Sequence, residues 1–276
     1  MELHARVMES QQRTFFNAMS VPKIVAHRGY AAKYPENTLL SISQALKLGV
    51  PFVEFDVQLS ADGVPVLHHD VSLERTCDID QSIFELKLSE LQMIQACETK
   101  RFARKYLNMG IGIPTLQDVI YMLKNWPHAQ AFVELKEESL AKHGIEKTIK
   151  TILKTIAPAL DQCVIISYHG LAIRCARAMG AKKIGWVIDE WSDSARSTAT
   201  ELAPDYLFCN YRKVPFKKGG LWPGPWEWAL YEVTNPELAI GLHNNGVDLV
   251  ESMDIEQILN HPRFQEEGGN LGGYLL

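Results

Sequence analysis

The stretch FVEFDVQLSADGVPVLHH, residues 52–69, decides the fold that we predict for this chain. Two mainly apolar runs, 52–57 and 64–69, are separated by QLSADG, in which Asp62-Gly63 is a typical hairpin turn. Strands joined this tightly must be antiparallel, because a parallel pair needs a crossover of about a dozen residues or more. The stretch therefore predicts a β-hairpin.

Apolar, β-branched runs alternate with helical patterns along the rest of the chain, which is typical of parallel βα units. We expect strands at 24–27, 52–57, 64–69, 131–136, 162–168, 182–188, 205–209, 228–233 and 247–251. We expect helices at 38–48, 115–125, 138–157, 170–179, 192–201, 236–245 and 254–260. With 64–69 set aside as the antiparallel hairpin partner, the remaining strands suit an α/β fold, a (β/α)8 TIM barrel.

Two segments depart from this simple alternation. Residues 71–113 are too long for a plain loop and partly helical, so we expect a small insert after the second-strand hairpin, covering one end of the barrel. Residues 213–228 lack a clear helical pattern, so the crossover there should be irregular. No linker or repeat divides the chain, and 276 residues suit one barrel. We therefore expect residues 1–276 to form a single domain.

Composition excludes several classes of protein. The net charge of −5 leaves no basic footprint for nucleic acid. The five cysteines are scattered and form no CxxC pair, which favours reduced thiols in the cytoplasm over a disulfide scaffold or a zinc ribbon. The N-terminal segment has charges throughout and no apolar core, so it is not expected to be a signal peptide. No apolar run approaches the roughly 18 residues of a membrane span. We expect a soluble, cytoplasmic protein without an integral membrane segment.

Charged residues interrupt two of the expected strands. Glu54 and Asp56 are two apart and face the same side, and Glu134 and Lys136 repeat the pattern. Buried parallel strands are normally continuously apolar, and a buried carboxylate is costly unless it is paired or coordinated. A structural ion pair such as Glu54–Lys136 and an outward, solvated face are alternatives. Three carboxylates against one lysine favour a site for a hard cation, Mg²⁺ or Ca²⁺.

Two histidines are expected beside these carboxylates. The hairpin brings His69 opposite about residue 56, within one register step, and His27 ends the first strand, where the catalytic loops of a barrel emerge. Either histidine alone would read as structural. Together with the carboxylates, an arginine and a lysine they indicate an active site. His68 alternates to the opposite face and is interpreted as structural.

Five linked elements between residues 27 and 76 share their order and spacing with one known family. They are HRG at 27–29, PENT at 35–38, EFDV at 54–57, DG at 62–63, and HD followed by LERT at 69–76. Later segments, FVELK at 132–136 and VIIS at 164–167, fit the same family. On these motifs the chain resembles the glycerophosphodiester phosphodiesterases of the PLC-like phosphodiesterase superfamily, over roughly residues 22–255.

The resemblance implies a (β/α)8 barrel and metal-dependent hydrolysis of small-molecule glycerophosphodiesters to sn-glycerol 3-phosphate and an alcohol, in lipid and glycerol metabolism. It implies a Mg²⁺ or Ca²⁺ cofactor and His/His acid–base catalysis, and it leaves a homodimer open. The residues it assigns are Glu54, Asp56 and Glu134 as metal ligands, His27 and His69 as acid and base, and Arg28, Lys136, Glu36 and Tyr231 around the substrate.

The match departs from the family pattern near the C-terminus. Tyr231-Glu232-Val233-Thr234 stands where the family usually has Trp-Thr-Val-Asn, and the closing segment GVDLVESMD is also unusual. The aromatic position taken by Tyr231 generally helps to hold glycerol in the family. This departure concerns the fit of the substrate rather than the acid, base or metal residues.

Alternatives remain for the reaction and for its nucleophile. We hypothesise His27 as base and His69 as acid, with either the substrate's 2-hydroxyl group or water as nucleophile. A lysophospholipase D or phospholipase C-like enzyme acting on lysolipids is one rival, and a non-catalytic binding barrel is another. The first rival could use an aromatic cluster as an acyl channel, although the same residues could instead pack on the barrel or form a dimer contact: Phe216, Leu221, Trp222, Trp226 and Trp228.

Overall fold

The computed structural model describes residues 20–271, so the expectation about a signal peptide concerns a segment that lies before the described part. Among residues 20–271, no helix combines the length and the apolar character needed to cross a membrane.

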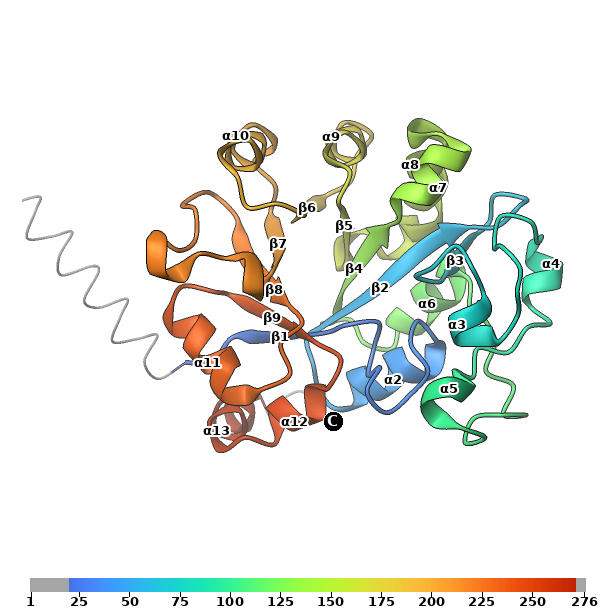
Figure 1. Ribbon diagram of the computed structural model, residues 1–276, viewed down its shortest axis with the longest axis horizontal. Coiled ribbons are helices and arrows are strands. Elements are labelled where there is room, and N and C mark those ends of the chain that lie inside the picture. Colours follow the sequence, from blue (N-terminus) through green and yellow to red (C-terminus); the bar gives the residue numbers. More distant parts are fainter. Residues whose placement is uncertain (1–19, 272–276) are drawn as a thin grey trace, which may run out of the picture.

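The described chain forms a closed barrel (Figure 1). Its strands are β1 (Lys23–Ala26), β2 (Phe52–Leu59), β3 (Pro65–Leu67), β4 (Gln130–Leu135), β5 (Cys163–Ser167), β6 (Lys183–Ile188), β7 (Tyr206–Asn210), β8 (Glu227–Tyr231) and β9 (Leu249–Ser252). The sheet order is β1-β9-β8-β7-β6-β5-β4-β2-β3, and pairing of β1 with β2 closes it. Only β3 is antiparallel to its neighbour. The predicted (β/α)8 barrel with an added hairpin strand is confirmed.

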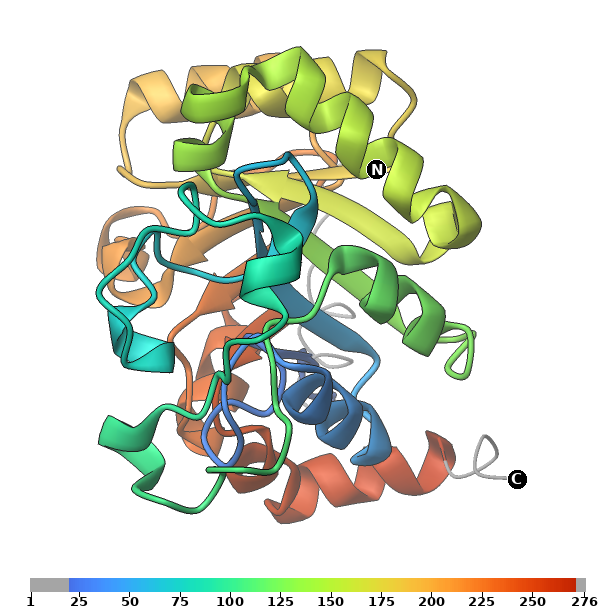
Figure 2. The same cartoon turned by 90° about the vertical axis from the view of Figure 1, so that its right-hand side faces the viewer.

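Helices surround the barrel in both views (Figures 1 and 2). They are α2 (Leu39–Lys47), α6 (Leu116–Leu123), α7 (Glu137–His143), α8 (Ile145–Ile156), α9 (Gly170–Ala178), α10 (Asp193–Leu202), α11 (Pro236–Asn244), α12 (Ile255–Leu259) and α13 (Pro262–Leu271). A 3₁₀-helix, η1 (Ala157–Gln162), leads from α8 to β5. Two further short ones, η2 (Tyr211–Lys213) and η3 (Phe216–Lys218), replace a helix between β7 and β8, which is the irregular crossover that the sequence predicts.

One predicted helix is wrong in its continuity. The pattern over 138–157 suggested a single helix, but α7 and α8 are separate and meet at Gly144. Gly144 has φ +87°, a conformation that residues with a β-carbon adopt only with strain, so the backbone turns there. The apolar spacing continues across the break, which is why the pattern concealed it.

The sequence predicted that His69 lies opposite about residue 56, within one register step. The observed hairpin register differs from this pairing by one residue, which is within that range. Leu67 lies opposite Val57, and the backbone N–H of His68 donates to the carbonyl of Asp56 at 3.1 Å. Residue 68, rather than 69, is therefore opposite residue 56.

The inside of the barrel has an apolar floor. Phe132 lies at its centre, with its ring centroid 5.5 Å from that of Phe52, 5.0 Å from Tyr206 and 4.9 Å from Phe208. Since alternate residues of a strand face the same side, the next inward positions are two residues further along each strand. On β2, β4 and β9 these positions hold carboxylates instead of apolar groups.

The segment after the hairpin contains α3 (Glu74–Cys77), α4 (Leu88–Leu91) and α5 (Thr99–Phe102). It has an apolar cluster of its own, in which Leu73, Ile83 and Leu91 are fully buried. The insert lies on the right-hand side of Figure 1. The helical, packed character expected for 71–113 is therefore present, while a single-domain organisation of the whole chain stays a prediction.

The turn after β1 depends on glycine at position 29. Gly29 has φ +76°, and a β-carbon there would come within 2.6 Å of backbone atoms of Ser41 and Ile42, at the start of α2. We expect Gly29→Ala to lower the free energy of unfolding by about 3 kcal/mol, because it combines an unfavourable φ with a backbone clash. Denaturant unfolding measures the loss. Gly63→Ala is the matched control: its φ is +77°, with nothing within 4 Å, so its loss should be only about 1 kcal/mol. Equal losses would contradict the clash.

Candidate active site

A pocket with about 590 Å³ of empty volume opens at the carboxyl ends of the strands. The lining includes most of the side chains that the sequence singled out, namely His27, Arg28, Asp56, His69, Glu134, Lys136 and Tyr231. Glu54 and Glu36 are predicted site residues that do not line it. Both are buried, with 1% and 4% of their surface exposed, and both contact residues that do.

The predicted metal ligands lie together. Carboxylate oxygens of Glu54, Asp56 and Glu134 all lie within 4.8 Å of one another. Burial, together with the charge of Asp56, raises the pKa of Glu134 and raises that of Glu54 well above its usual range. Oε1 of Glu54 is buried and has no hydrogen-bond partner. A divalent cation would satisfy this atom and relieve the mutual repulsion, so the residues fit Mg²⁺ or Ca²⁺.

Two cations stand on either side of Asp56. Arg28 Nε lies 3.1 Å from Oδ2, and Lys136 Nζ lies 3.3 Å from Oδ1 and 2.9 Å from Oε1 of Glu134. Burial alone would raise the pKa of Asp56, but these two positive charges outweigh it and lower the pKa well below its usual range. Both cations line the pocket and can meet a phosphate there.

Glu36 lies outside the pocket and holds the side chains of Arg28 and Arg75 in place. Its Oε1 accepts hydrogen bonds from Arg28 at 2.8 Å and from Arg75 at 2.7 Å. Burial by itself would raise the pKa of Glu36, but the hydrogen bond and charge of Arg75 and the charge of Arg28 lower it to about 2. Glu36 therefore orients two guanidinium groups and does not reach the pocket.

His27 is the more enclosed of the two histidines. Its side chain is 13% exposed, and its Nε2 lies 3.9 Å from Oε2 of Glu54. Burial, aided by the charge of Arg28, lowers the pKa of His27 to about 3. The ring is therefore neutral at physiological pH.

His69 has a different environment. Its side chain is 32% exposed, and its Nδ1 lies 2.6 Å from Oδ1 of Asp70. Asp70 in turn accepts a 2.6 Å hydrogen bond from Nε of Arg75. Burial would raise the pKa of Asp70, but the hydrogen bonds from Arg75 and His69 lower it to about 2, so the carboxylate beside the His69 ring stays ionised. The neighbouring His68 is buried and bonded to the carbonyl of Asp70 and to Thr76, as its structural interpretation requires.

Three residues that shape the site escaped the sequence reasoning. Asn37, which the sequence analysis included only as part of the PENT motif, exchanges two hydrogen bonds with Asp56 at 2.8 and 3.0 Å, while Thr38 caps α2. Tyr168 pairs its hydroxyl with that of Tyr231 at 3.0 Å. Glu251 is the third.

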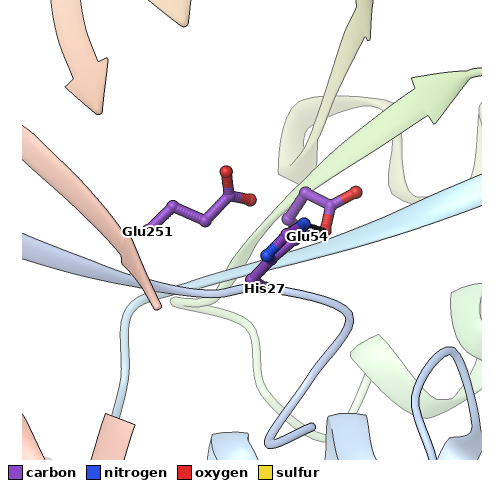
Figure 3. A group of neighbouring side chains, drawn as sticks. All are labelled: His27, Glu54 and Glu251. Carbon is purple, nitrogen blue, oxygen red and sulfur yellow. Dashed lines mark ion pairs between the residues drawn. The ribbon is translucent and has the colours of Figure 1, made fainter. Parts of the chain in front are cut away.

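Glu251 lies on the inner face of β9, two residues after Leu249 of the apolar floor. Figure 3 shows Glu251 directed toward His27 and Glu54, and ligand atoms of the three lie within 4.8 Å of one another. The signal was available in the sequence, because a carboxylate at alternate spacing in a buried strand is the same pattern that drew attention to Glu54 and Asp56.

The tryptophan-rich segment packs on the barrel. Trp222, Trp226 and Trp228 are buried in the outer core, and the ring centroids of Trp191 and Trp222 are 4.2 Å apart. None of these four lines the pocket. The segment therefore supplies no acyl channel to this pocket.

Comparisons with known proteins agree with the resemblance. Residues 27–203 match the model of the Glycerophosphoryl diester phosphodiesterase family. The glycerophosphodiester phosphodiesterase of Caldanaerobacter subterraneus subsp. tengcongensis is 28% identical over 244 residues, 86% of this chain and 96% of that protein. The glycerophosphodiester phosphodiesterase of Bacillus subtilis is 25% identical over 218 residues, 72% of this chain and 74% of the relative.

Solved structures give the same result. A phosphodiesterase from Oleispira antarctica, in complex with the product sn-glycerol-3-phosphate, has a TM-score of 0.72 at 27% identity, covering 86% of this chain and 95% of that one. A glycerophosphodiester phosphodiesterase from Thermotoga maritima has a TM-score of 0.66 at 23% identity, covering 87% of this chain and 98% of that one. This likeness is evidence for the fold only.

Proposed function

Because this chain belongs to the glycerophosphoryl diester phosphodiesterase family, we propose that it hydrolyses glycerophosphodiesters to sn-glycerol 3-phosphate and an alcohol, with a bound divalent cation. The observation that carries the proposal is that two histidines, two fixed cations and the carboxylates of Asp56 and Glu134 line one pocket, with an oxygen of Glu54 within 4.8 Å of both carboxylates. Phosphodiester cleavage requires neutralisation of the phosphate charge and transfer of protons, and these groups can provide both.

The first demand is neutralisation of charge, because a phosphodiester anion repels nucleophiles. Glu54, Asp56 and Glu134 would hold Mg²⁺ or Ca²⁺, which would supply Lewis-acid stabilisation of negative charge at the phosphate. Arg28 and Lys136 add positive charge that ion pairs with Asp56 hold in place before the substrate arrives.

The second demand is proton transfer. His27 is the more enclosed histidine, which suits a base acting on the constant part of the substrate, glycerol. His69 is more exposed, which suits an acid acting at the variable head group. In this scheme the 2-hydroxyl oxygen attacks phosphorus and gives its proton to His27. The bond to the head-group oxygen breaks as His69 protonates it. Water then attacks the cyclic phosphate and gives a proton to His69, while the bond to the 2-oxygen breaks and that oxygen takes the proton from His27, so both histidines return to their starting states.

The test is a panel of glycerophosphodiesters with choline, ethanolamine, glycerol and inositol head groups. We expect sn-glycerol 3-phosphate to form, EDTA to abolish its formation, and Mg²⁺ or Ca²⁺ to restore it. Activity that survives EDTA would contradict the cation requirement. No turnover of any member by metal-loaded protein would favour the non-catalytic barrel, and turnover of lysophosphatidylcholine alone would favour the lysophospholipase D reading.

Cytoplasmic location and a homodimer remain predictions.

A further inference from the structure

Glu251 is a buried acidic residue, and one of its side-chain oxygens has no hydrogen-bond partner. It is 3% exposed, it lines the pocket, and its Oε1 has no hydrogen-bond partner. The positive side chains of the pocket are engaged elsewhere: Arg28 pairs with Glu36 and Asp56, and Lys136 with Asp56 and Glu134. A carboxylate buried in this way is costly unless something satisfies it. Because Glu251 lines the pocket, a polar group of a bound molecule can supply that partner.

A second cation is a poor partner for Glu251. The group within reach of one ion is His27, Glu54 and Glu251, and it includes an imidazole, whereas Mg²⁺ and Ca²⁺ prefer oxygen ligands. Glu54 also already belongs to the carboxylate group of the proposed cation site. Coordination would further occupy the ring nitrogen that has to accept a proton from the nucleophile.

A hydroxyl donor suits the geometry better. A nitrogen of His27 and a carboxylate oxygen of Glu251 lie within 4.8 Å of each other. Hydroxyl groups on adjacent carbons can each form a hydrogen bond of about 2.8 Å to acceptors at this separation. Glycerol in a glycerophosphodiester carries such a pair, and the 2-hydroxyl is the one assigned to His27.

We propose that Glu251 accepts a hydrogen bond from the 1-hydroxyl group of the glycerol moiety and is thereby a specificity-determining residue that rejects 1-acylated substrates. The inference rests on the proposed function. In a lysophospholipid this oxygen is esterified and has no proton to donate, so binding would leave the carboxylate buried and unpaired. A site built to bond a hydroxyl group discriminates against an analogue that lacks it, because the buried polar group of the site is then left unpaired.

The test compares three substrates on the wild type and on Glu251→Ala: glycerophosphocholine, its 1-deoxy analogue, and 1-acyl-lysophosphatidylcholine below its micellar concentration. For the wild type we expect kcat/KM to fall about 100-fold on removal of the 1-hydroxyl group, because a buried acceptor is then left unpaired. For Glu251→Ala the two short substrates should differ less than about threefold, because the acceptor is gone. The preference over the lysolipid should shrink in parallel.

Two further measurements separate this role from others. Glu251→Gln, which is nearly isosteric, should keep the melting temperature of the apo protein and its bound-metal content by elemental analysis. Glu190→Gln, an exposed carboxylate beyond the carboxyl end of β6, removes the same charge and should leave all three rates unchanged.

The outcomes are distinguishable. An equal penalty for the 1-deoxy analogue in the wild type and in Glu251→Ala would overturn the inference while leaving the proposed function intact. Loss of a metal equivalent in Glu251→Gln would make the residue a ligand instead. Failure of the wild type to hydrolyse glycerophosphocholine and the rest of the glycerophosphodiester panel would refute the proposed function itself.

Discussion

Replacing His69 by alanine is expected to lower kcat for glycerophosphocholine by roughly 10³-fold, within the range that a positioned proton carrier supplies. The choline alkoxide is a poor leaving group, and without His69 nothing at the exposed side of the pocket protonates it. Stability should hardly change, because the ring is 32% exposed and its hydrogen bond is to the neighbouring residue Asp70. Steady-state kinetics and thermal unfolding measure the two quantities.

The leaving group identifies which histidine is the acid. With p-nitrophenol in place of choline, departure needs no proton, so His69→Ala should recover most of the wild-type rate. His27→Ala should lose activity on both substrates, because deprotonation of the nucleophile is still required. The reverse pattern of rescue would exchange the two roles, and full activity of His69→Ala on glycerophosphocholine would refute its participation.

His68 is the matched control for His69. It is 3% exposed, and its ring nitrogens contact the carbonyl of Asp70 at 2.6 Å and Thr76 Oγ1 at 2.8 Å. His68→Ala should therefore reduce the free energy of unfolding by about 1–3 kcal/mol through the polar atoms left unpaired. Adjacent histidines thus give opposite results, one catalytic and one structural.

Replacing Glu54 by glutamine is expected to remove cation binding and lower kcat/KM by roughly 10³-fold, several kcal/mol of transition-state stabilisation. The fold should tolerate the change. The amide oxygen can still accept the 2.9 Å hydrogen bond from the backbone N–H of Arg28, and one negative charge leaves a crowded group. The apo protein should melt at the same temperature as the wild type or higher.

The readout that does not depend on turnover is the stabilisation caused by the metal. At 100 times its Kd, a ligand adds about 2.7 kcal/mol to the free energy of unfolding. Mg²⁺ or Ca²⁺ should raise the melting temperature of the wild type and of Glu251→Gln, but not that of Glu54→Gln. A normal metal-induced shift in Glu54→Gln would exclude this residue from the cation site.

The features that could be predicted from the sequence depend on interactions between residues that are close together along the chain. The hairpin follows from a two-residue turn signal, and the shared face of Glu54 and Asp56 follows from the period of a strand. The alternation of strands and helices then leads to the barrel. The break at Gly144 was missed because apolar spacing persists across it, whereas the backbone conformation does not.

Other features depend on closure of the barrel. Glu36 reads as a pocket residue in its motif, but the fold places it behind Arg28, where Arg75 of the insert also reaches it. Glu251 enters the site because β9 pairs with β1, with Val25 opposite Glu251, although these residues are far apart in sequence.

Sequence by itself thus determined which strands carry charge toward the interior and which residue types could hold a cation or move a proton. Tertiary structure alone decided which of these charges meet, which are already neutralised, and that Oε1 of Glu251 is left without a hydrogen-bond partner. The physical reason is that side-chain direction is set within a few residues of backbone, whereas electrostatic partners are set by contacts between distant segments, which form only when the barrel closes.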